Sequence, residues 1–298
     1  MTISEGPFST TELAGYRLAQ RMAYDCAEHV AASLWEGITE RETAAMMRDY
    51  LSQRGIHYYF HAPFVWFGDR TALSLDWSDD DFLPSERRLT QGMPLILDVA
   101  PLVEGFAADI GYATCFGSNP LVEQMLADLE SYRAMIPKAL NEGRTLQEIY
   151  QDIDAAIAAQ GYRSSHHAYP AGVIGHRVTR LAMGPGDEAL TGGFGSSAFH
   201  FLRDKKIASA ADPLISPYWN GTHLSDHAPE AGLWAVEPHF ARDGIGVKFE
   251  ELLVVSPEGS YWLDDELPHV KRWQHSTLLG SGVRAVGAED FSLKGAIR

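Results

Sequence analysis

The chain has 298 residues, an apolar content of 45% and a formal net charge of −16 at pH 7, which excludes a nucleic-acid backbone as the expected partner. No run of about 18 apolar residues is present, so we expect no membrane span, and we expect no signal peptide at the N-terminus. With only Cys26 and Cys115, a disulfide framework is not expected, and a cytoplasmic location is favoured.

An internal duplication sets the order of the predicted elements. The sequence EGITERE at 36–42 recurs as EGRTLQE at 142–148. Each copy has a threonine followed three residues later by a glutamate, the capping box that starts a helix. Gly55 and Gly161 follow the two copies at the same spacing, and each predicts the C-terminal end of that helix.

A longer amphipathic helix is predicted before each copy, because apolar residues there recur at helical spacing. The first set steps by four and the second by three or four: Leu18, Met22, Cys26, Val30 and Leu34; then Val122, Met125, Leu129, Tyr132 and Ile136. Strand-like segments follow each helix pair, at 58–68 and 95–117, and then at 169–178, 232–240 and 246–255. This order predicts an α+β fold of two related halves.

The sequence predicts one domain over residues 1–275, with halves at about 10–118 and 119–265, and a tail over 276–298. Two insertions break the duplication, an acidic loop at 74–88 and a Gly- and Ser-rich stretch at 184–227. Long irregular segments of this kind are either functional lids or disordered.

The segment 95–117 reads as a hairpin in which each strand carries one aspartate. With Val103-Glu104 as the turn, Asp98 and Asp109 lie directly opposite each other on one face. A turn lengthened by Gly105 is the alternative, and a shift of one residue would separate the two acids.

A second hairpin repeats this arrangement at 236–255, where Asp243-Gly244 is a strong turn signal. Counting from that turn places Glu237 opposite Glu250. A single acid in a strand more often points to solvent, but like charges placed opposite each other twice destabilise a sheet unless cations compensate them. Four carboxylates and one imidazole can hold two divalent ions about 3.5–4 Å apart. His176, in the apolar VIGHRV, is one candidate for the imidazole among 12 histidines.

These motifs resemble the M24 metallopeptidases of the pita-bread fold, which include methionine aminopeptidase, aminopeptidase P, prolidase and creatinase. The resemblance runs from about residue 10 to 265 and is closest to prolidase and aminopeptidase P, without their N-terminal domain. It implies two divalent ions (manganese, iron, cobalt or zinc) and a catalytic role for Glu237 as general base and acid. The metal ligands that it implies are Asp98, Asp109, His176, Glu237 and Glu250.

The chain departs from the family pattern where relatives carry substrate-handling histidines or arginine. These positions hold Leu75, Tyr112, Gly172 and Met183, and Arg177 and Thr179 replace the glycines beside the metal histidine. His223 and His227, just before the Glu237 strand, are candidate catalytic replacements, with a surface loop as the alternative. His239 shares a strand face with Glu237 and is a candidate supporting group or extra ligand. His61, His166, His167 and His200 are left without a role.

The first hypothesis is therefore a dinuclear hydrolase that cleaves an amide bond of a small amino-acid-like or Xaa-Pro substrate. The alternative is a metalloenzyme that cleaves another C–N or C–S bond or performs an iron-dependent oxidation. A binding protein without activity is the third reading, and the intact ligand set argues against it. We expect a small molecule or short peptide as partner, and a homodimer.

Overall fold

The computed structural model describes residues 8–183 and 189–275. The predicted tail at 276–298 and positions 184–188 of the Gly- and Ser-rich insertion lie outside these ranges. The helices are α1 (Thr10–Ala32), α2 (Glu40–Ser52), α3 (Pro120–Asn141), α4 (Leu146–Ala159) and α5 (Ser196–Ala208). Within the described ranges, no helix is long and apolar enough to cross a membrane.

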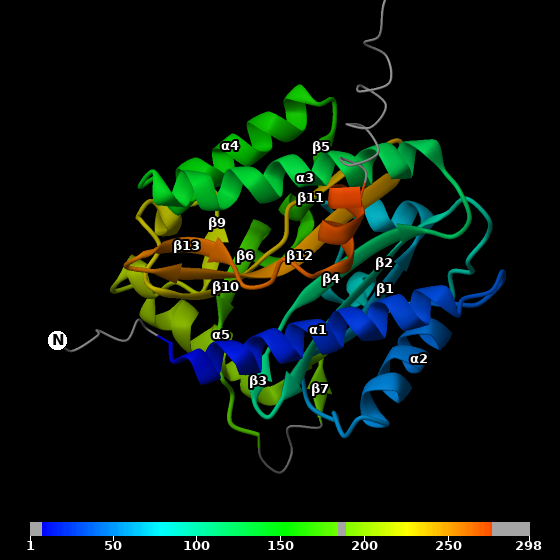
Figure 1. Cartoon of the computed structure of the whole chain (residues 1–298), viewed down its shortest axis with the longest axis horizontal. Helices are drawn as coiled ribbons and strands as arrows, with labels where there is room; N and C mark the ends of the chain where they lie inside the picture. Colours follow the sequence, from blue (N-terminus) through cyan, green and yellow to red (C-terminus); the bar gives the residue numbers. More distant parts are fainter. Residues whose placement is uncertain (1–7, 184–188, 276–298) are drawn as a thin grey trace, which may run out of the picture.

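The strands form one antiparallel sheet, and four of them lie beside its main path. The main path runs β7 (Leu190–Thr191), β8 (Phe194–Gly195), β1 (Tyr59–Phe67), β2 (Pro94–Val103), β4 (Ile110–Cys115), β12 (Ile245–Ser256), β10 (Gly232–Val236), β6 (Val173–Val178) and β9 (Tyr218–Asn220). The side strands are β3 (Phe106–Ala107), β5 (Arg163–Ser164), β11 (His239–Arg242) and β13 (Gly259–Trp262). The halves join where β4 pairs with β12, with Phe249 opposite Tyr112 and Glu250 opposite Gly111 (Figure 1).

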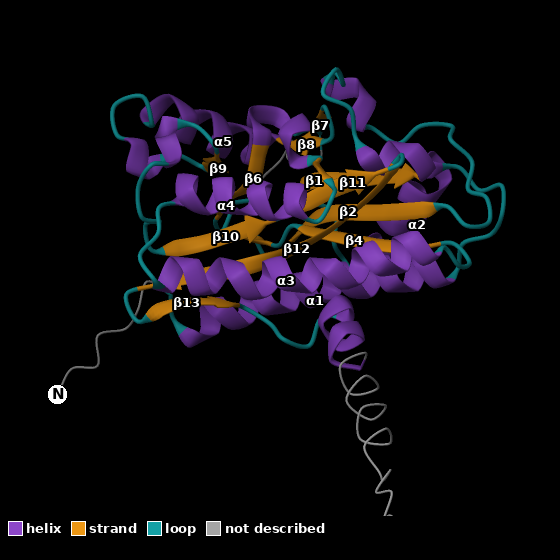
Figure 2. Ribbon diagram, turned by 90° about the horizontal axis from the view of Figure 1, so that it is seen from above, coloured by secondary structure: helices purple, strands orange, loops and turns teal. Residues whose placement is uncertain are grey.

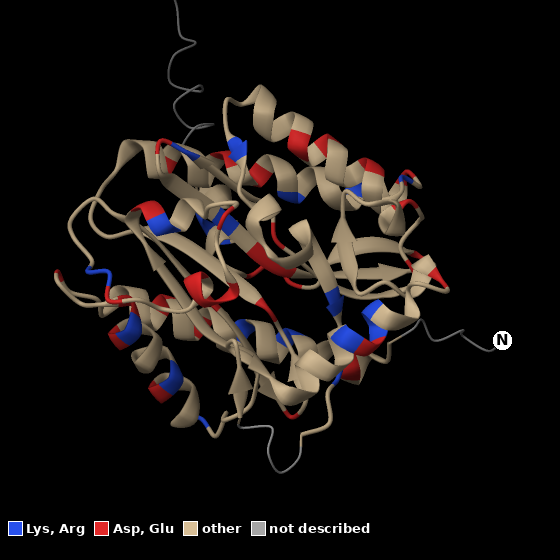
Figure 3. Ribbon diagram, turned by 180° about the vertical axis from the view of Figure 1, so that it is seen from behind, with Lys and Arg blue, Asp and Glu red and all other residues tan. Residues whose placement is uncertain are grey.

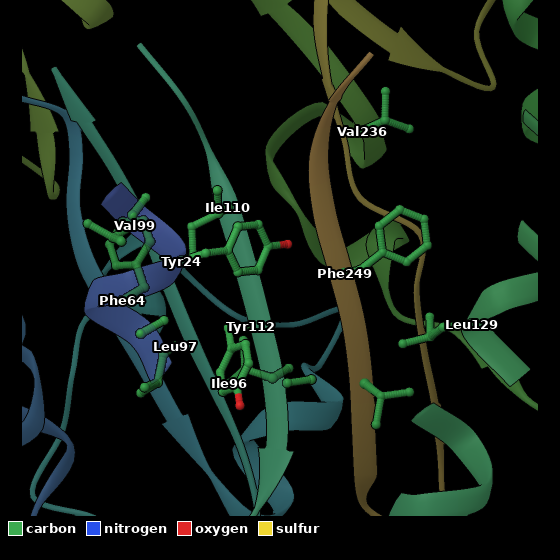
Figure 4. Close-up of a cluster of buried hydrophobic side chains, with 14 of the residues drawn as sticks. Tyr24, Phe64, Ile96, Leu97, Val99, Ile110, Tyr112, Leu129, Val236 and Phe249 are labelled. Atoms are coloured by element: carbon green, nitrogen blue, oxygen red, sulfur yellow. The ribbon is translucent and has the colours of Figure 1, made fainter. Parts of the chain in front are cut away.

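The long helices lie on one face of the sheet, and α5 lies on the other (Figure 2). Helix α1 packs on β2 and β4, and α3 packs on β12 and β13. The interface between helices and sheet is the main core, in which side chains of both halves meet, among them Tyr24, Ile110, Leu129 and Phe249 (Figure 4). Strands β2, β4 and β12 therefore have one side buried against helices.

Both predicted capping boxes are confirmed. The side chain of Thr39 accepts a hydrogen bond from the backbone amide of Glu42, and that of Thr145 accepts one from the amide of Glu148. In return, each threonine backbone amide donates to the carboxylate of the same glutamate. Gly55 and Gly161 have φ of +78° and +79°, values that favour glycine after a helix. The duplication in the sequence is thus a duplication of helix geometry.

The predicted buried face is confirmed for α3 and partly wrong for α1. All five predicted apolar positions of α3 are buried, whereas Leu18 of α1 is 52% exposed. A strict step of four drifts around a helix by about 40° per step. The predicted Cys26 and Val30 are buried, and the rest of the buried face of α1 is built from Tyr16 and Tyr24 together with small residues such as Ala23.

The two predicted hairpins have different outcomes. The second is confirmed, because its pairs follow the predicted count from His239↔Lys248 through Val236↔Glu251. In the first hairpin the turn is Glu104-Gly105, and Asp98 pairs with Gly111 rather than with Asp109. The predicted pairing of Asp98 with Asp109 was therefore wrong, and the observed strand register differs from it by two residues. A shift of two keeps both side chains on the same face, so they still lie close together.

Candidate metal centre

Four buried acids converge where the two halves of the sheet join. Asp98 lies on β2 and Glu250 on β12, while Asp109 and Glu237 stand in the short breaks before β4 and before β11. None is more than 6% exposed, and Figure 3 shows the acidic segments on the central strands. Burial disfavours four charged carboxylates unless positive groups or hydrogen bonds compensate them.

His176 on β6 joins these acids, as the resemblance implied. Its Nε2 lies 3.0 Å from Oδ2 of Asp109, and its Nδ1 lies 3.2 Å from the carbonyl oxygen of Arg177. The ring stacks on Phe60 at 5.1 Å between centroids. Packing and the carbonyl together hold Nε2 toward the carboxylates.

His61 on β1 also faces the acids, although no role was predicted for it from the sequence. Its Nε2 lies 2.8 Å from Oδ1 of Asp109 and 3.3 Å from Oδ1 of Asp98. Its Nδ1 lies 2.9 Å from the carbonyl oxygen of Ala62. The available signal was an imidazole inside the otherwise apolar strand at 58–68.

The donor atoms fit a divalent cation. In both histidines Nδ1 faces a carbonyl oxygen and Nε2 is turned toward the carboxylates. Each Nε2 faces an oxygen of Asp109, so a proton there donates to the carboxylate, and a bound cation can take the place of that proton. Oε1 of Glu250 is buried without a hydrogen-bond partner. Three overlapping groups of ligand atoms lie within 4.8 Å of one another: His61, Asp98 and Asp109; Asp109, His176 and Glu250; Asp98, Glu237 and Glu250.

The electrostatics of the protein alone follow from this crowding. Burial raises the pKa of Asp109, but the flanking imidazoles of His61 and His176 outweigh it and lower the pKa below its ordinary value. Burial lowers the pKa of His61, but the Asp109 carboxylate outweighs it and raises the pKa to about 9. Burial raises the pKa of Glu250, and the Asp109 charge adds to that rise. The site favours positive charge near Asp109.

Lys248 is a further buried group of the centre that the sequence analysis did not single out. It stands two residues before Glu250 on β12, and side chains at that spacing share a face. Its Nζ donates to Oδ2 of Asp98 at 2.5 Å, Oε2 of Glu237 at 2.7 Å and Oε2 of Glu250 at 2.9 Å. Burial lowers the pKa of Lys248, but the carboxylates of Asp98, Glu237 and Glu250 together outweigh it and raise the pKa well above its ordinary value.

His239 supports the centre from behind, one of the two roles predicted for it. The ring is buried, and Nε2 lies 2.7 Å from the carbonyl oxygen of Thr71. Its Nδ1 lies 2.9 Å from the hydroxyl of Tyr169, whose ring packs against the Lys248 ammonium at 5.2 Å. Burial lowers the pKa of His239 well below its ordinary value, so the ring is neutral. Both nitrogens are engaged, which leaves neither to bind an ion.

His223 and His227 do not lie at the cavity above the acids, so their predicted catalytic role is not supported. His223 is exposed. The nitrogens of His227 lie 2.8 Å from the carbonyl of Ala228 and 3.0 Å from that of Leu224. The His227 ring therefore contacts backbone carbonyls of its own turn and does not reach the acids, although His227 lies close to Glu237 in sequence.

The acids and His176 form the floor of a cavity of about 440 Å³. Its walls are aromatic, formed by Phe60, Phe64, Trp66, Phe82, Tyr169, Phe194, Phe199 and Tyr218. Both predicted insertions contribute: the acidic loop supplies Asp79 and Phe82, and the Gly- and Ser-rich stretch supplies Phe199 and Arg203. The insertions therefore shape the site.

A large apolar cavity over a cluster of perturbed acids is typical of an enzyme's active site. The sequence profile of metallopeptidase family M24 matches residues 14–257. The chain belongs to this family, and its fold is the pita-bread fold of the family.

The solved structures to which the chain is similar have the same fold. X-Pro aminopeptidase of Thermotoga maritima aligns with a TM-score of 0.60 and 17% identity, over 86% of this chain and 61% of that one. Prolidase of Pyrococcus horikoshii aligns at 0.59 and 19% identity, over 87% and 64%. Methionine aminopeptidase of Rickettsia prowazekii aligns at 0.58 and 12% identity, over 86% and 98%.

In sequence, the chain is 26% identical over 156 residues to an uncharacterized peptidase of Staphylococcus aureus. That match covers 52% of this chain and 42% of the relative. The chain thus spans under half of this relative and about three fifths of the first two structures.

Proposed function

We propose that the chain is a metal-dependent hydrolase that cleaves an amide bond of a small amino-acid-like substrate. The observation that carries this proposal is the convergence of two imidazoles on Asp109. The Nε2 atoms of His61 and His176 face its two oxygens at 2.8 Å and 3.0 Å, on the floor of an open cavity. Donor sets of carboxylate and imidazole suit manganese, iron, cobalt or zinc.

When bound, a divalent ion lowers the pKa of water and polarises a carbonyl group. Asp109, His176 and Glu250 are the residues that would hold it. Glu237 lines the cavity, with one oxygen bonded to Lys248 and the carboxylate otherwise directed at substrate space. It takes a proton from the attacking water and passes it to the leaving nitrogen, the role that the family resemblance implies.

The cavity walls favour a substrate with a bulky apolar or aromatic part. Eight aromatic side chains line a space of about 440 Å³, which is the size of site that encloses a small molecule. Arg203 and Lys206 of α5 also line the cavity, and they offer positive charge to a carboxylate of the substrate. An Xaa-Pro dipeptide with a large first residue, or an aromatic amino-acid amide, has these features.

One observation favours the alternative of a different metal chemistry on this fold. The positions at which relatives carry substrate-handling histidines hold Met183 and Leu75, which are 39% and 69% exposed, and Gly172, which has no side chain. The described part of the cavity wall offers no histidine other than the two that face Asp109. This change in the substrate-handling positions favours the alternative, which is cleavage of another C–N or C–S bond or an iron-dependent oxidation.

The test compares metal-free protein with protein loaded separately with manganese, iron, cobalt or zinc. Product release is followed by mass spectrometry on a panel of Xaa-Pro dipeptides and amino-acid amides. We expect metal-dependent cleavage, with phenylalanyl substrates cleaved faster than alanyl ones. Metal-loaded protein that cleaves no member of the panel contradicts the hydrolase proposal, and oxygen uptake by the iron form then supports the alternative.

A further inference from the structure

Lys248 stands at a point in the centre where three ligand carboxylates meet. Asp98, Glu237 and Glu250 offer oxygens within 4.8 Å of one another, one of this centre's three overlapping groups able to hold a cation. The Nζ atom lies 2.5–2.9 Å from one oxygen of each. An ammonium group has three donors, and these three contacts use all of them. A divalent ion bound by the same three oxygens would need the volume that Nζ fills.

The backbone opposite Lys248 leaves room for this side chain. A Cβ atom on Gly111 would lie 2.1 Å from Cε of Lys248 and 3.0 Å from both Cδ and Nζ. Gly111 does not have a positive φ, so its backbone conformation does not require glycine. Its lack of a side chain lets the lysine stem pass over β4 and reach Asp98. The side chain of Lys248 is 0% exposed, so it is built into the core of the site.

Both oxygens of Asp98 are occupied by nitrogen atoms. Oδ2 accepts from Lys248 at 2.5 Å, and Oδ1 lies 3.3 Å from Nε2 of His61. Asp98 is one of the five ligands that the family resemblance implies, yet here it faces two basic side chains. The Asp98 carboxylate is therefore bound by side chains of the protein, Lys248 and His61, at the positions where a metal ion would bind.

The opposite end of the centre, formed by Asp109, His176 and Glu250, has ligand atoms that Lys248 does not occupy. Oδ2 of Asp109 and Nε2 of His176 lie 3.0 Å apart, about the separation of neighbouring ligands around an ion bound at 2.0–2.2 Å. Oε1 of Glu250 is buried without a hydrogen-bond partner and lies 4.0 Å from the same Nε2. These three residues form one of the groups able to hold a cation.

We propose that the Lys248 ammonium permanently fills one of the two cation positions expected for this fold, so that the centre binds a single divalent ion. Asp109, His176 and Glu250 hold that ion, while Asp98 binds Lys248 and His61. The inference rests on the proposed metal dependence of the site. It replaces the dinuclear centre expected from the sequence with a mononuclear one, in which a fixed side-chain cation neutralises the remaining carboxylates.

The experiment measures bound metal in the whole protein. Metal-free protein is titrated with Mn²⁺ by calorimetry, and the loaded protein is studied by elemental analysis and electron paramagnetic resonance. We expect one ion per chain and the spectrum of an isolated Mn²⁺. Two ions per chain with a spin-coupled spectrum overturn the inference and leave the proposed function standing. If no ion binds, both the inference and the proposed metal dependence are overturned.

Three variants locate the ion and test the lysine. Lys248→Ala opens the position between the three carboxylates, and we expect it to bind a second ion; a folded variant that still binds one overturns the role of Lys248. We expect His176→Ala to lose the ion and His61→Ala to keep it. The reverse result would place the ion at Asp98 and contradict the assignment. Circular dichroism of each variant identifies any that fails to fold, and the wild-type stoichiometry decides the proposal in that case.

Discussion

Gly111 and Lys248 face each other across the junction of β4 and β12, and each fits the space that the other leaves. A Cβ atom at Gly111 would overlap Cε of Lys248 at 2.1 Å. Because Gly111 pairs with both Asp98 and Glu250 in the sheet, any shift of the lysine stem is passed to the carboxylates that its ammonium binds. This pair links the packing of the sheet to the charge balance of the centre.

Gly111→Ala is expected to destabilise the protein by about 1–3 kcal/mol, the range for an added methyl group in a packed core. In a Lys248→Ala background the same change is expected to cost much less, because the overlapping atom is gone. Chemical denaturation of the two single variants and the double variant measures this coupling. Gly232→Ala is the matched control, since its Cβ would approach nothing closer than Nη1 of Arg177 at 3.3 Å and the carbonyl oxygen of Glu230 at 3.8 Å. Additive effects of the two changes would contradict the proposed fit.

Asp109→Ala is expected to abolish activity and to weaken metal binding by more than about 100-fold. This residue faces both histidines, and replacing a direct ligand should exceed the 10–100-fold effect typical of supporting residues. Calorimetry with Mn²⁺ checks the affinity. Asp69→Ala serves as control, because its side chain is 68% exposed and forms an ion pair with Arg87 at the surface. Full metal content in the Asp109 variant would refute the assigned centre.

Phe199→Ala is expected to raise KM for an aromatic substrate about tenfold with little change in kcat. Loss of apolar contact worth roughly 1.5 kcal/mol has this effect when the contact holds the substrate equally in the ground and transition states. Phe199 lines the cavity yet is 49% exposed, so stability should be little affected. Ile207→Ala on the same helix is the control, since Ile207 is 67% exposed and does not line the cavity. Equal KM changes in both variants would show that Phe199 does not contact substrate.

The duplicated capping boxes predict a matched pair of stability losses. Thr145→Ala is expected to cost about 1 kcal/mol, and Thr39→Ala up to about 2 kcal/mol because Thr39 is buried. Thermal unfolding measures both, and the losses should add in the double variant because the boxes stand on separate helices. Serine at either position should restore most of the stability, since it keeps the hydroxyl. If serine is no better than alanine, the capping hydrogen bond is not the cause.

The hydrogen-bonded carboxylate of Asp154 is expected to stabilise the folded protein, and this contribution should be lost at acidic pH. Its carboxylate lies 3.1 Å from Nε2 of His166 and 2.9 Å from that of His167. Burial raises the pKa of Asp154, but the hydrogen bonds with His166, Ser164 and His167 together outweigh it and lower the pKa to about 2. A lowered pKa in the folded state stabilises above the ordinary value of 3.8, and that stabilisation disappears as pH falls toward 2.

Asp154→Asn should therefore be less stable than wild type by about 1 kcal/mol at about pH 5, a value reduced for solvent screening of this half-buried group. The difference should shrink toward zero as the pH approaches 2. Urea unfolding at several pH values measures it. Glu130→Gln, an exposed change on α3, should show no such trend. A difference for Asp154→Asn that stays constant with pH would rule out the lowered pKa of Asp154 as its source.

The sequence alone determined the features that depend on neighbours along the chain. The capping boxes at Thr39 and Thr145 and the turn at Asp243-Gly244 are local, because their hydrogen bonds close within a few residues. The second hairpin therefore had the predicted register. The first did not, because Glu104 and Gly105 both adopt positive φ and form the turn one residue later than predicted. Moving the turn by one residue shifts the strand pairing by two residues. The shared face of its acids was still correct, because side chains alternate with a period of two.

The tertiary structure alone decided which other side chains meet the acids. His61 comes from β1 and Lys248 from β12, and neither position differs in spacing from an ordinary strand residue. They reach Asp98 only because β1, β2, β4 and β12 lie side by side and because Gly111 leaves space between them. His223 and His227 lie close to Glu237 in sequence but are held by their own turn. Side-chain contacts across a sheet depend on strand order and free volume, which sequence spacing does not encode.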